Sequence, residues 1–379
     1  MAILDSPPPG DVGCPVVDLK ALLGVIFDSR LTFGPLLRTT LARGNALFES
    51  LFFAGESGGF GLPILCAQVP LRVETALLYP SPFLFLADRA RFSLDNMQAA
   101  WARRLLGCAT GPPLPGPVVI VQCGWHMRLG TKMVERTILA RARLFLLPGE
   151  HPASNMFEVA SSTCCSTWAS SVRAWMDSLD PPLPDVVDWP FAGPQACAKA
   201  RSDPAARRLL LSSYKFYVVR PAMLKLDLPA FQKAAAASLP VFCLPFSSWL
   251  SGPPGLQWNL LDLALGPGSW LQFRLWAVVR MSGCWPLQVL GAPLCVPTLP
   301  RCGGCGARDV DVWHALFSCP ATAALRSSLW SRLPLPPPSC PAQVSQFLFH
   351  QSRPPTERRE HVHFVAASLL LAMTGAAQF

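Results

Sequence analysis

The sequence Arg301-Cys302-Gly303-Gly304-Cys305-Gly306, continued through His314 to Cys319, decides how the C-terminal part of this chain folds. The spacing is C-x2-C-x8-H-x4-C. Two cysteines separated by two glycines predict a tight turn that directs both sulfurs at one point, because glycine adopts backbone conformations closed to other residues. Three thiolates and one imidazole then form a tetrahedral ligand set that suits zinc.

The sequence therefore predicts a structural Zn²⁺ ion bound by Cys302, Cys305, His314 and Cys319. Four protein ligands leave no open coordination position, so a catalytic metal is not expected. Asp311 is expected to hold the second imidazole nitrogen, with Trp313, Leu316 and Phe317 packed beneath the site. The alternative is a chance cluster in a chain that contains 14 cysteines.

Several segments upstream carry apolar residues at helical spacing. The predicted helices span residues 35–53, 93–106 (with Ser93 as N-cap), 131–147, 156–179, 203–217 and 269–281. Residues 22–33 predict a β-hairpin with its turn at 28–30. The remainder of 221–300 is broken by proline and glycine and is predicted to be irregular. The expected fold is mainly α, with a short N-terminal hairpin, a Pro-rich irregular middle and a small C-terminal zinc module.

Composition places the chain among globular proteins with a mild preference for nucleic acid. Only 15% of residues are charged, yet the formal net charge is +9. Arginine outnumbers lysine, and its planar guanidinium suits phosphate oxygens. The helix at 131–147 is basic and amphipathic, which fits either a solvated face or a phosphate-contacting one.

The cysteines and the apolar segments indicate where the protein resides. Residues 1–18 contain no basic-then-apolar signal segment, so an intracellular location, nuclear or cytoplasmic, is expected. Cys66, Cys108, Cys123 and Cys243 are predicted to be small core residues. No segment offers about 20 unbroken apolar residues, so no membrane partner is expected. The stretch 364–379 is predicted to be a buried C-terminal helix, with a membrane anchor as the alternative.

Three parts of the sequence resemble the C-terminal part of non-LTR (LINE-type) retrotransposon reverse transcriptases. Residues 22–33, Leu-Leu-Gly-Val-Ile-Phe-Asp-Ser-Arg-Leu-Thr-Phe, are similar to the hairpin that grips the primer terminus in that family. Residues 73–79, 94–98 and 103–107 resemble the thumb and the connection after it. The third part is the cysteine cluster with Asp311, Cys319-Pro320 and Arg326, since these polymerases carry a Cys-Cys-His-Cys site in this order.

The sequence also departs from that family. The resemblance implies an adjacent Asp-Asp pair that binds two catalytic metal ions, and this sequence contains no such pair. Leu22 stands where the family has tyrosine, which weakens the expected primer grip. Fingers and most of the palm would precede Met1. The expected protein is therefore no enzyme but a polymerase fragment that retains nucleic-acid-binding parts.

The resemblance and the breaks in the sequence divide the chain into six expected regions. They are a palm-edge hairpin (1–34), a thumb-like helical region (35–108), a basic helical connection (109–180), a Pro-rich linker region (181–268), the zinc module (269–333) and a Pro-rich linker with a C-terminal helix (334–379).

The expected partner is RNA or DNA, bound through phosphates, with no small-molecule substrate. The residues predicted to contact nucleic acid are Arg103, Arg104, Lys132, Arg136, Arg141, Arg143, Arg274 and Arg280. The alternative is a zinc-stabilised scaffold or protein-interaction module without a nucleic-acid role.

Overall fold

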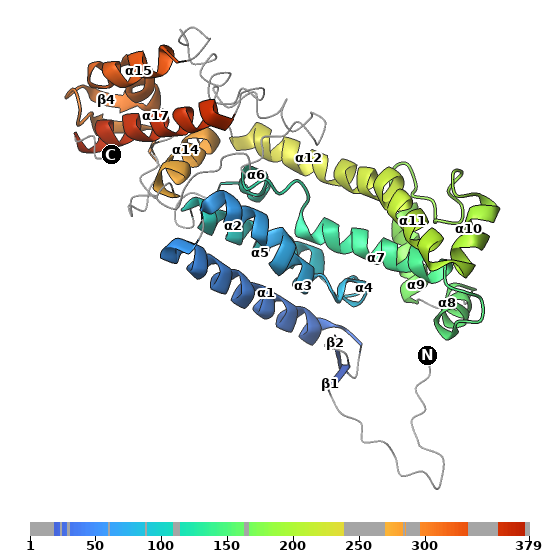
Figure 1. The fold of residues 1–379 in the computed structure, drawn as a ribbon. Helices are drawn as coiled ribbons and strands as arrows, with labels where there is room; N and C mark the ends of the chain where they lie inside the picture. The colour runs from blue at the N-terminus through green and yellow to red at the C-terminus, as the bar shows by residue number, and fades with distance from the viewer. Residues whose placement is uncertain are drawn as a thin grey trace.

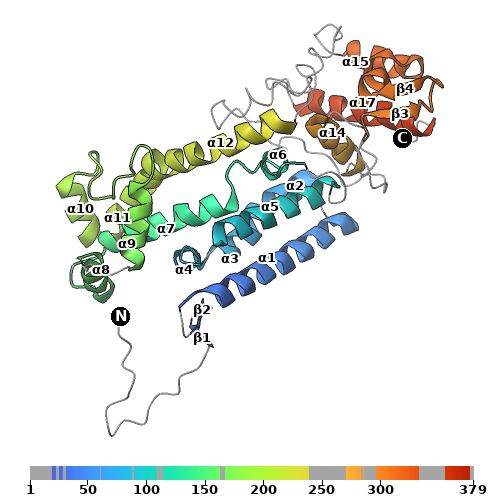
Figure 2. The ribbon, with the colours of Figure 1, turned by 180° about the vertical axis from the view of Figure 1, so that it is seen from behind.

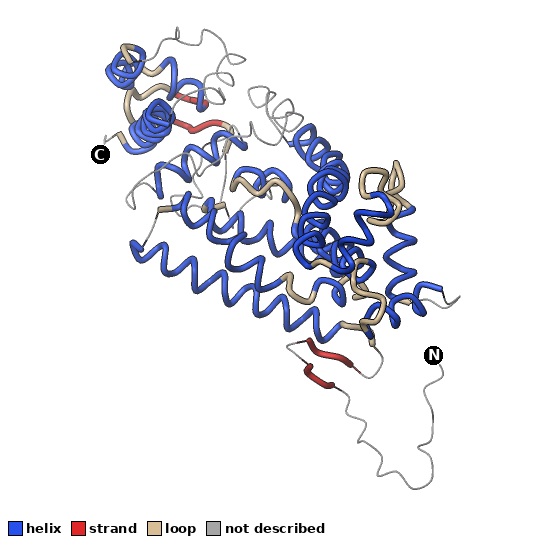
Figure 3. Tube along the Cα trace, turned by 45° about the vertical axis from the view of Figure 1, so that its right-hand side comes forward, coloured by secondary structure: helices blue, strands red, loops and turns tan. Residues whose placement is uncertain are grey.

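The structure is a computed structural model and describes residues 19–22, 25–28, 31–59, 61–87, 89–108, 114–162, 167–238, 270–282, 285, 296–332 and 355–375. Most of these residues are helical, as predicted, and Figure 3 shows two short strand pairs lying far apart on the molecule. Among the helices that the structure describes, none has both the length and the hydropathy of a membrane-spanning segment.

The elements follow one another along the chain as β1 (Leu19–Leu22), β2 (Val25–Asp28), α1 (Gly34–Ala54), η1 (Gly55–Gly59), α2 (Leu62–Gln68), η2 (Val69–Glu74), α3 (Thr75–Leu77), α4 (Ser81–Leu84), α5 (Ala90–Leu106), α6 (Gly116–Gln122), α7 (Leu129–Phe145), α8 (Pro152–Ser162), α9 (Trp168–Asp177), α10 (Gly193–Ser202), α11 (Pro204–Tyr214), η3 (Lys215–Val219), α12 (Arg220–Ser238), α14 (Trp270–Ser282), β3 (Thr298–Arg301), β4 (Arg308–Asp311), η8 (His314–Ser318), η9 (Pro320–Thr322), α15 (Ala323–Trp330) and α17 (Pro355–Thr374).

Four long helices form the body of the molecule. Helices α1, α5, α7 and α12 lie next to one another in this order (Figures 1 and 2). Helices α8 to α11 gather at one end of this body, and α14, α15, α17 and the β3–β4 pair lie at the other. One apolar core runs through the body and into the C-terminal module.

Close packing of α1 on α5 shows how the apolar pattern builds this body. Pro35 lies in the first turn of α1, where its missing N–H costs nothing. Phe48 stacks on Trp101 with ring centroids 5.3 Å apart, and the Trp101 indole donates to Asn45 Oδ1 at 2.8 Å. A Cβ at Gly44 would lie 2.3 Å from the side chain of Leu77, so glycine lets the chains approach.

A short hairpin lies in the predicted N-terminal region, but the strand pairing predicted within residues 22–33 was wrong. Strand β2 pairs antiparallel with β1, which precedes it, and Leu22 opposes Val25. Asp28 of the predicted turn belongs to β2, and residues 29 and 30 lie outside the described part of the chain. The apolar run was recognised as a strand, whereas its partner β1 is interrupted by the charged Lys20.

Three helical predictions also need correction. Helix α5 begins at Ala90 with Arg89 as its N-cap, so Ser93 lies inside the helix and does not cap it. The segment 156–179 contains two helices, because a capping box formed by Thr167 and Ser170 starts α9 as a separate helix. The segment 221–238, predicted to be irregular, belongs to α12, which continues through Pro229. Buried Met223, Asp227 and Phe231 recur every four residues, so tertiary packing outweighs the proline penalty.

Helix α7 begins in a polar network built by its neighbours. Asp95 of α5 accepts the backbone N–H of Gly130 at 2.8 Å, and Asp227 of α12 accepts the hydroxyl of Thr131 at 2.6 Å. Arg128 contacts both carboxylates, at 3.3 Å and 2.8 Å. These bonds satisfy N–H groups that the first helical turn leaves open and tie α5, α7 and α12 together.

Candidate metal centre and predicted nucleic-acid contacts

The first two cysteines lie in the turn between β3 and β4. Leu299 opposes Val310 in this antiparallel pair, and both side chains are buried. The N–H of Cys302 donates to Ala307 O and that of Gly306 donates to Cys302 O, each at 2.8 Å. Gly306 has a φ of 78°, which favours glycine. The predicted glycine-rich turn therefore forms a closed loop of backbone hydrogen bonds.

The other two ligands are His314, the first residue of η8, and Cys319, the residue that follows η8. Asp311 Oδ1 accepts the backbone N–H of His314 at 2.7 Å, and the N–H of Cys319 donates to His314 O at 2.7 Å. Asp311 was predicted to hold the imidazole, but the hydrogen bond it makes fixes the backbone of His314. A short carboxylate three residues before a helical turn caps that turn more readily than it reaches a side chain.

The four side chains converge on one point. Their ligand atoms all lie within 4.8 Å of one another, with Cys302 Sγ 3.8 Å from Cys319 Sγ and Cys305 Sγ 3.3 Å from His314 Nε2. A tetrahedral ion with bonds of about 2.3 Å to sulfur separates its sulfur ligands by about 3.8 Å. Cys302, Cys305, His314 and Cys319 can therefore hold a metal ion, as the sequence predicted.

The protonation of the ligands differs across the cluster. A backbone hydrogen bond from Ala307 lowers the pKa of the Cys305 thiol, whereas burial raises the pKa of Cys319 to about 11. Burial also lowers the pKa of His314, which favours the neutral imidazole that ligates metals. A metal ion must therefore displace a proton from Cys319 at neutral pH.

The last helix of the described chain covers the turn that carries the first two cysteines. The N–H of Gly303 donates to Ala372 O of α17 at 2.6 Å. A Cβ at Gly303 would lie 2.6 Å from the backbone nitrogen of Gly375, and one at Gly304 would lie 2.9 Å from the Ala321 methyl. Both glycines are thus needed for close packing, whereas the backbone of the turn requires glycine at Gly306.

An aromatic row lies beneath the cluster, as predicted for Trp313 and Phe317. Ring centroids are 4.8 Å apart between Trp313 and Phe317, 6.3 Å between Phe317 and Trp330, and 5.8 Å between Trp330 and Phe364 of α17. Leu316 is fully buried beside them. The metal ligands and the apolar core of the C-terminal module are therefore one packed unit.

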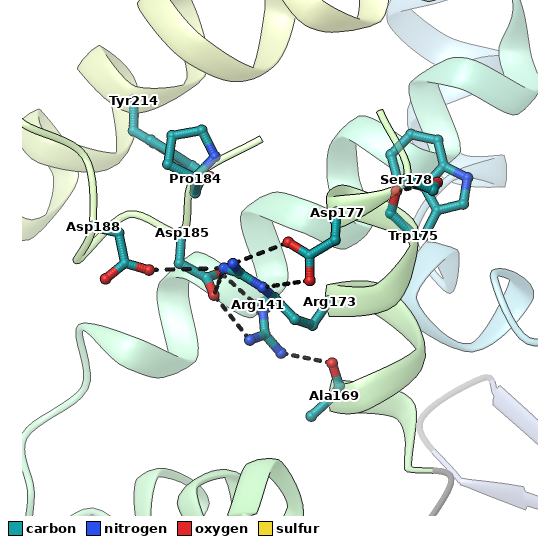
Figure 4. A network of polar contacts seen from close by, with 10 residues as sticks. All are labelled: Arg141, Ala169, Arg173, Trp175, Asp177, Ser178, Pro184, Asp185, Asp188 and Tyr214. Carbon is teal, nitrogen blue, oxygen red and sulfur yellow. Dashed lines mark hydrogen bonds and ion pairs between the residues drawn. The ribbon is translucent and has the colours of Figure 1, made fainter. Parts of the chain in front are cut away.

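Arg141 was wrongly predicted to contact nucleic acid. Its side chain is 5% exposed, and its Nε and Nη2 donate to the two oxygens of Asp185 at 2.9 and 3.0 Å. Nη1 donates to Ala169 O at 2.7 Å. Figure 4 shows Arg173 meeting the same Asp185 carboxylate. Amphipathic spacing placed Arg141 on a helix but could not show that a distant carboxylate neutralises it.

Three further residues that were predicted to contact nucleic acid bind other parts of the protein. Lys132 pairs with buried Glu74 at 2.5 Å. Arg103 donates to Leu114 O at 2.8 Å. Arg274 donates to Leu105 O at 2.9 Å and lies over the Trp270 ring. These side chains join elements of the fold, which weakens their assignment as phosphate contacts.

The remaining predicted contacts reach the surface to different degrees. Arg143 is exposed, and Arg136 is half-buried. Arg104 is half exposed and pairs with Glu49 at 2.9 Å. Arg280 lies in α14, but its side chain is outside the described residues, as is all of Cys243. Cys66, Cys108 and Cys123 are buried, as predicted.

Sequence reasoning missed a denser group of basic residues on α10 to α12. Residues 199–225 contain seven basic residues and one acidic one, while the whole chain has a net charge of +9. Five of the seven are exposed, namely Lys199, Arg201, Arg208, Arg220 and Lys225. Counting charges in a window along the sequence would have found this group. The search for helical periodicity treated each helix separately and so did not bring these residues together.

Comparison with protein-family models, with curated proteins and with solved structures gave no match.

Proposed function

We propose that this chain is a nucleic-acid-binding protein related to the thumb and C-terminal zinc region of non-LTR retrotransposon reverse transcriptases. The observation that carries the proposal is the convergence of Cys302, Cys305, His314 and Cys319 at the end of a mainly helical body. The same ligand order after a helical region is what the resemblance implies. Binding, not catalysis, is the role proposed for the chain.

The proposed ion is Zn²⁺ in a structural role. Three thiolates and an imidazole suit zinc better than the hard cations, which prefer oxygen ligands. The sulfur separation of 3.8 Å between Cys302 and Cys319 fits the size of a tetrahedral zinc site. The ion would hold the β3–β4 turn to η8, and thereby support the face on which α17 packs.

Metal content tests this part of the proposal. The purified chain is expected to hold one zinc ion, and its Co²⁺-substituted form is expected to show the absorption bands of tetrahedral thiolate coordination. His314→Ala should abolish both signals, whereas His363→Ala, which changes an exposed histidine of α17, should keep them. A chain without stoichiometric zinc would remove the metal site and most of the proposed relationship.

The nucleic-acid role is proposed to depend on phosphate contacts from surface arginines. Each neutralised phosphate releases a counterion, so the affinity should fall steeply as salt rises. The logarithm of the affinity of the whole chain for an RNA or DNA oligonucleotide is expected to fall linearly with the logarithm of salt between about 50 and 200 mM. Fluorescence anisotropy measures this slope, and a flat response would contradict the role.

A protein-interaction role is the second candidate, because large apolar side chains are exposed on the body. Phe53 is 72% exposed and Leu71 is 66% exposed. Contiguous apolar surfaces mark interfaces in soluble proteins, and exposed side chains of this kind would contribute to one. A chain that holds zinc but binds neither RNA nor DNA at low salt would favour this role.

A further inference from the structure

Residues of α10 and α11 line a groove. These two helices lie at the end of the body opposite the metal module (Figure 1). The groove has a volume of about 760 Å³ and is lined by Trp189, Phe191, Lys199, Leu209 and Tyr217, among others. A second groove of about 490 Å³ shares Trp189 and Tyr217 with the first. The two form one continuous surface with these two rings at its centre.

Exposed aromatic rings line this groove, and ring packing holds the wall that carries Trp189. Phe191 is 86% exposed and Tyr217 is 69% exposed, although large aromatic rings are usually at least partly covered. Trp189 packs against Phe191 and against buried Tyr214, with ring centroids 6.0 Å apart in both pairs. The Tyr214 hydroxyl donates to Pro184 O at 2.6 Å, so the groove wall has a rigid support.

The buried ion-pair network fixes the loop that forms this wall. Asp185, four residues before Trp189, accepts from Arg141 of α7 and from Arg173 of α9 (Figure 4). A carboxylate paired by two guanidinium groups in a dry environment holds its backbone firmly. Arg141 therefore supports the groove from within, although it does not reach the surface.

Two exposed lysines line this surface, Lys199 in the first groove and Lys225 in the second. Asp180 also lines the second groove, and its backbone oxygen accepts from Lys225 Nζ at 3.0 Å. Neither lysine makes an ion pair with any residue that the structure describes. The only acidic residue within 199–225 is Asp203, which caps α11 through the N–H of Ala205. The positive charge around the groove is therefore available to an anionic partner.

We propose that this groove binds single-stranded RNA or DNA, with bases stacked on Tyr217 and Phe191 and phosphates near Lys199 and Lys225. Every base has a flat face that stacks on an exposed ring, and basic side chains follow the backbone of the strand. Paired bases in a duplex cannot reach the rings, so a single strand is preferred. This inference rests on the proposed nucleic-acid role and assigns it to residues outside the set predicted from sequence.

The test compares single-stranded and duplex oligonucleotides of one sequence with the zinc-loaded full chain. Replacing both rings, Phe191→Ala with Tyr217→Ala, is expected to weaken single-strand binding about tenfold or more and duplex binding less than twofold. Tyr217→Trp should retain affinity because it keeps a ring. Tyr79→Ala is the matched control, since Tyr79 is 63% exposed and lies outside both grooves. Circular dichroism verifies that each variant is folded.

The charge around the groove gives an independent measurement. Lys199→Gln with Lys225→Gln is expected to reduce the salt slope of single-strand binding by about 1.4, or about 0.7 for each lost phosphate contact.

Three outcomes would overturn the inference in distinguishable ways. If the parent chain binds nucleic acid with a salt slope and the ring variants bind equally well, the groove is not the site but the proposed function stands. If the parent chain binds no oligonucleotide, both fail. If a proline decapeptide binds and only its binding is lost in the ring variants, the groove recognises Pro-rich protein segments instead.

Discussion

Arg141 and Arg143 stand two positions apart on α7, yet their guanidinium groups meet different surroundings. Arg141 lies in the interior, shared between Asp185 and the rings of Phe145 and Phe157, whose centroids are 5.0 and 5.2 Å from its Cζ. Arg143 is exposed. Burying a guanidinium is favourable only when a carboxylate and hydrogen-bond acceptors satisfy it, and Arg141 has both.

Arg141→Gln is expected to lower the free energy of unfolding by about 3–5 kcal/mol, because it leaves Asp185 buried with one of its two cationic partners missing. Arg143→Gln, the matched control on the same helix, should change the free energy of unfolding by less than about 0.5 kcal/mol. Urea unfolding followed by circular dichroism measures both values. Equal effects of the two substitutions would mean that Arg141 is not buried with Asp185.

Asp95 gives the stability of the body a pH dependence. Burial raises its pKa from 3.8 to about 6, against the opposing effects of the Gly130 N–H and Arg128. Between about pH 4 and 6 the folded protein keeps this proton while the unfolded chain loses it, so this carboxyl contributes less stability as pH rises through that window. Above about pH 6 both states are ionised and its contribution is constant.

Asp95→Asn is therefore expected to flatten the pH dependence of the unfolding free energy between pH 4 and 6, by at most about 3 kcal/mol over the whole range. Asparagine keeps an oxygen that can accept from Gly130. Urea titrations of the parent and variant proteins at several pH values measure the difference. Parallel curves for the two proteins would show that Asp95 does not hold a proton in the folded state.

At the level of elements, local sequence predicted helices well where one apolar face was complete. Helix α1 was expected over 35–53 and spans Gly34–Ala54, and α14 was expected over 269–281 and spans Trp270–Ser282. The helical predictions failed where contacts between residues distant in the sequence determine the structure. Helix α12 depends on Asp227 meeting Arg128 and Thr131, about 100 residues earlier, and no local pattern shows such a contact.

The contact between the Cys302–Gly306 turn and α17 leads to a prediction about Gly303. Gly303→Ala is expected to displace the end of α17, because its Cβ would lie 2.6 Å from the backbone nitrogen of Gly375, and this backbone cannot rotate aside as a side chain would. Destabilisation of about 1–3 kcal/mol is expected, as for other overpacked sites. Gly149→Ala, at a position with open space around it, is the control.

Thermal unfolding and limited proteolysis near the C-terminus of α17 measure the effect of Gly303→Ala. Faster cleavage is expected for this variant than for Gly149→Ala. Identical cleavage rates would mean that the helix does not close on the turn.

Zinc binding should release protons, because Cys319 has its pKa raised to about 11 in the metal-free cluster. At pH 7 this thiol must lose its proton before its sulfur can bind the ion. Adding Zn²⁺ to the metal-free chain in a weak buffer with a pH indicator is expected to release at least one proton per ion. Cys319→Ser should reduce both the affinity and the release, and zinc binding without any acidification would contradict this description of the ligands.

At the scale of the whole molecule, the metal module adjoins the body largely through α14. Arg274 of this helix donates to Leu105 O at the end of α5, and Trp270 meets the Phe52 ring of α1 edge-on at 5.8 Å. The other face of α14 packs on α17. Helices α1, α5 and α7 pack against one another at a distance from the four ligands, so we expect the body to fold without the ion.

Removing zinc with a chelator is expected to unfold the module and leave the body intact. Backbone amides of β3, β4 and η8 should lose protection from hydrogen exchange, since their fold depends on the four ligands. Amides of α5 and α7 should stay protected. Mass-spectrometric exchange with and without chelator measures this pattern, and a loss of protection throughout both parts would show a single cooperative unit.

The sequence predicted the metal cluster far better than it predicted the basic surface. Four ligands within eighteen residues form a local signal, and geometry then leaves few ways to arrange them. Surface charge depends on which carboxylate each arginine meets, and Arg141, Lys132 and Arg103 all have partners from other elements. Phosphate-binding residues in a helical protein are therefore poorly inferred until the tertiary contacts are known.

The hydrogen bond from the N–H of Gly303 to Ala372 O implies an order in which the C-terminal module folds as the chain emerges from the ribosome. The two residues are separated by 69 positions, so the β3–β4 turn and its ligands are synthesised before the carbonyl that caps them. The ion can gather its four ligands first, and α17 then closes over a turn that is already rigid. Premature termination before residue 372 would leave a metal-loaded turn with its packing surface bare, a species that quality-control machinery recognises by its exposed apolar groups.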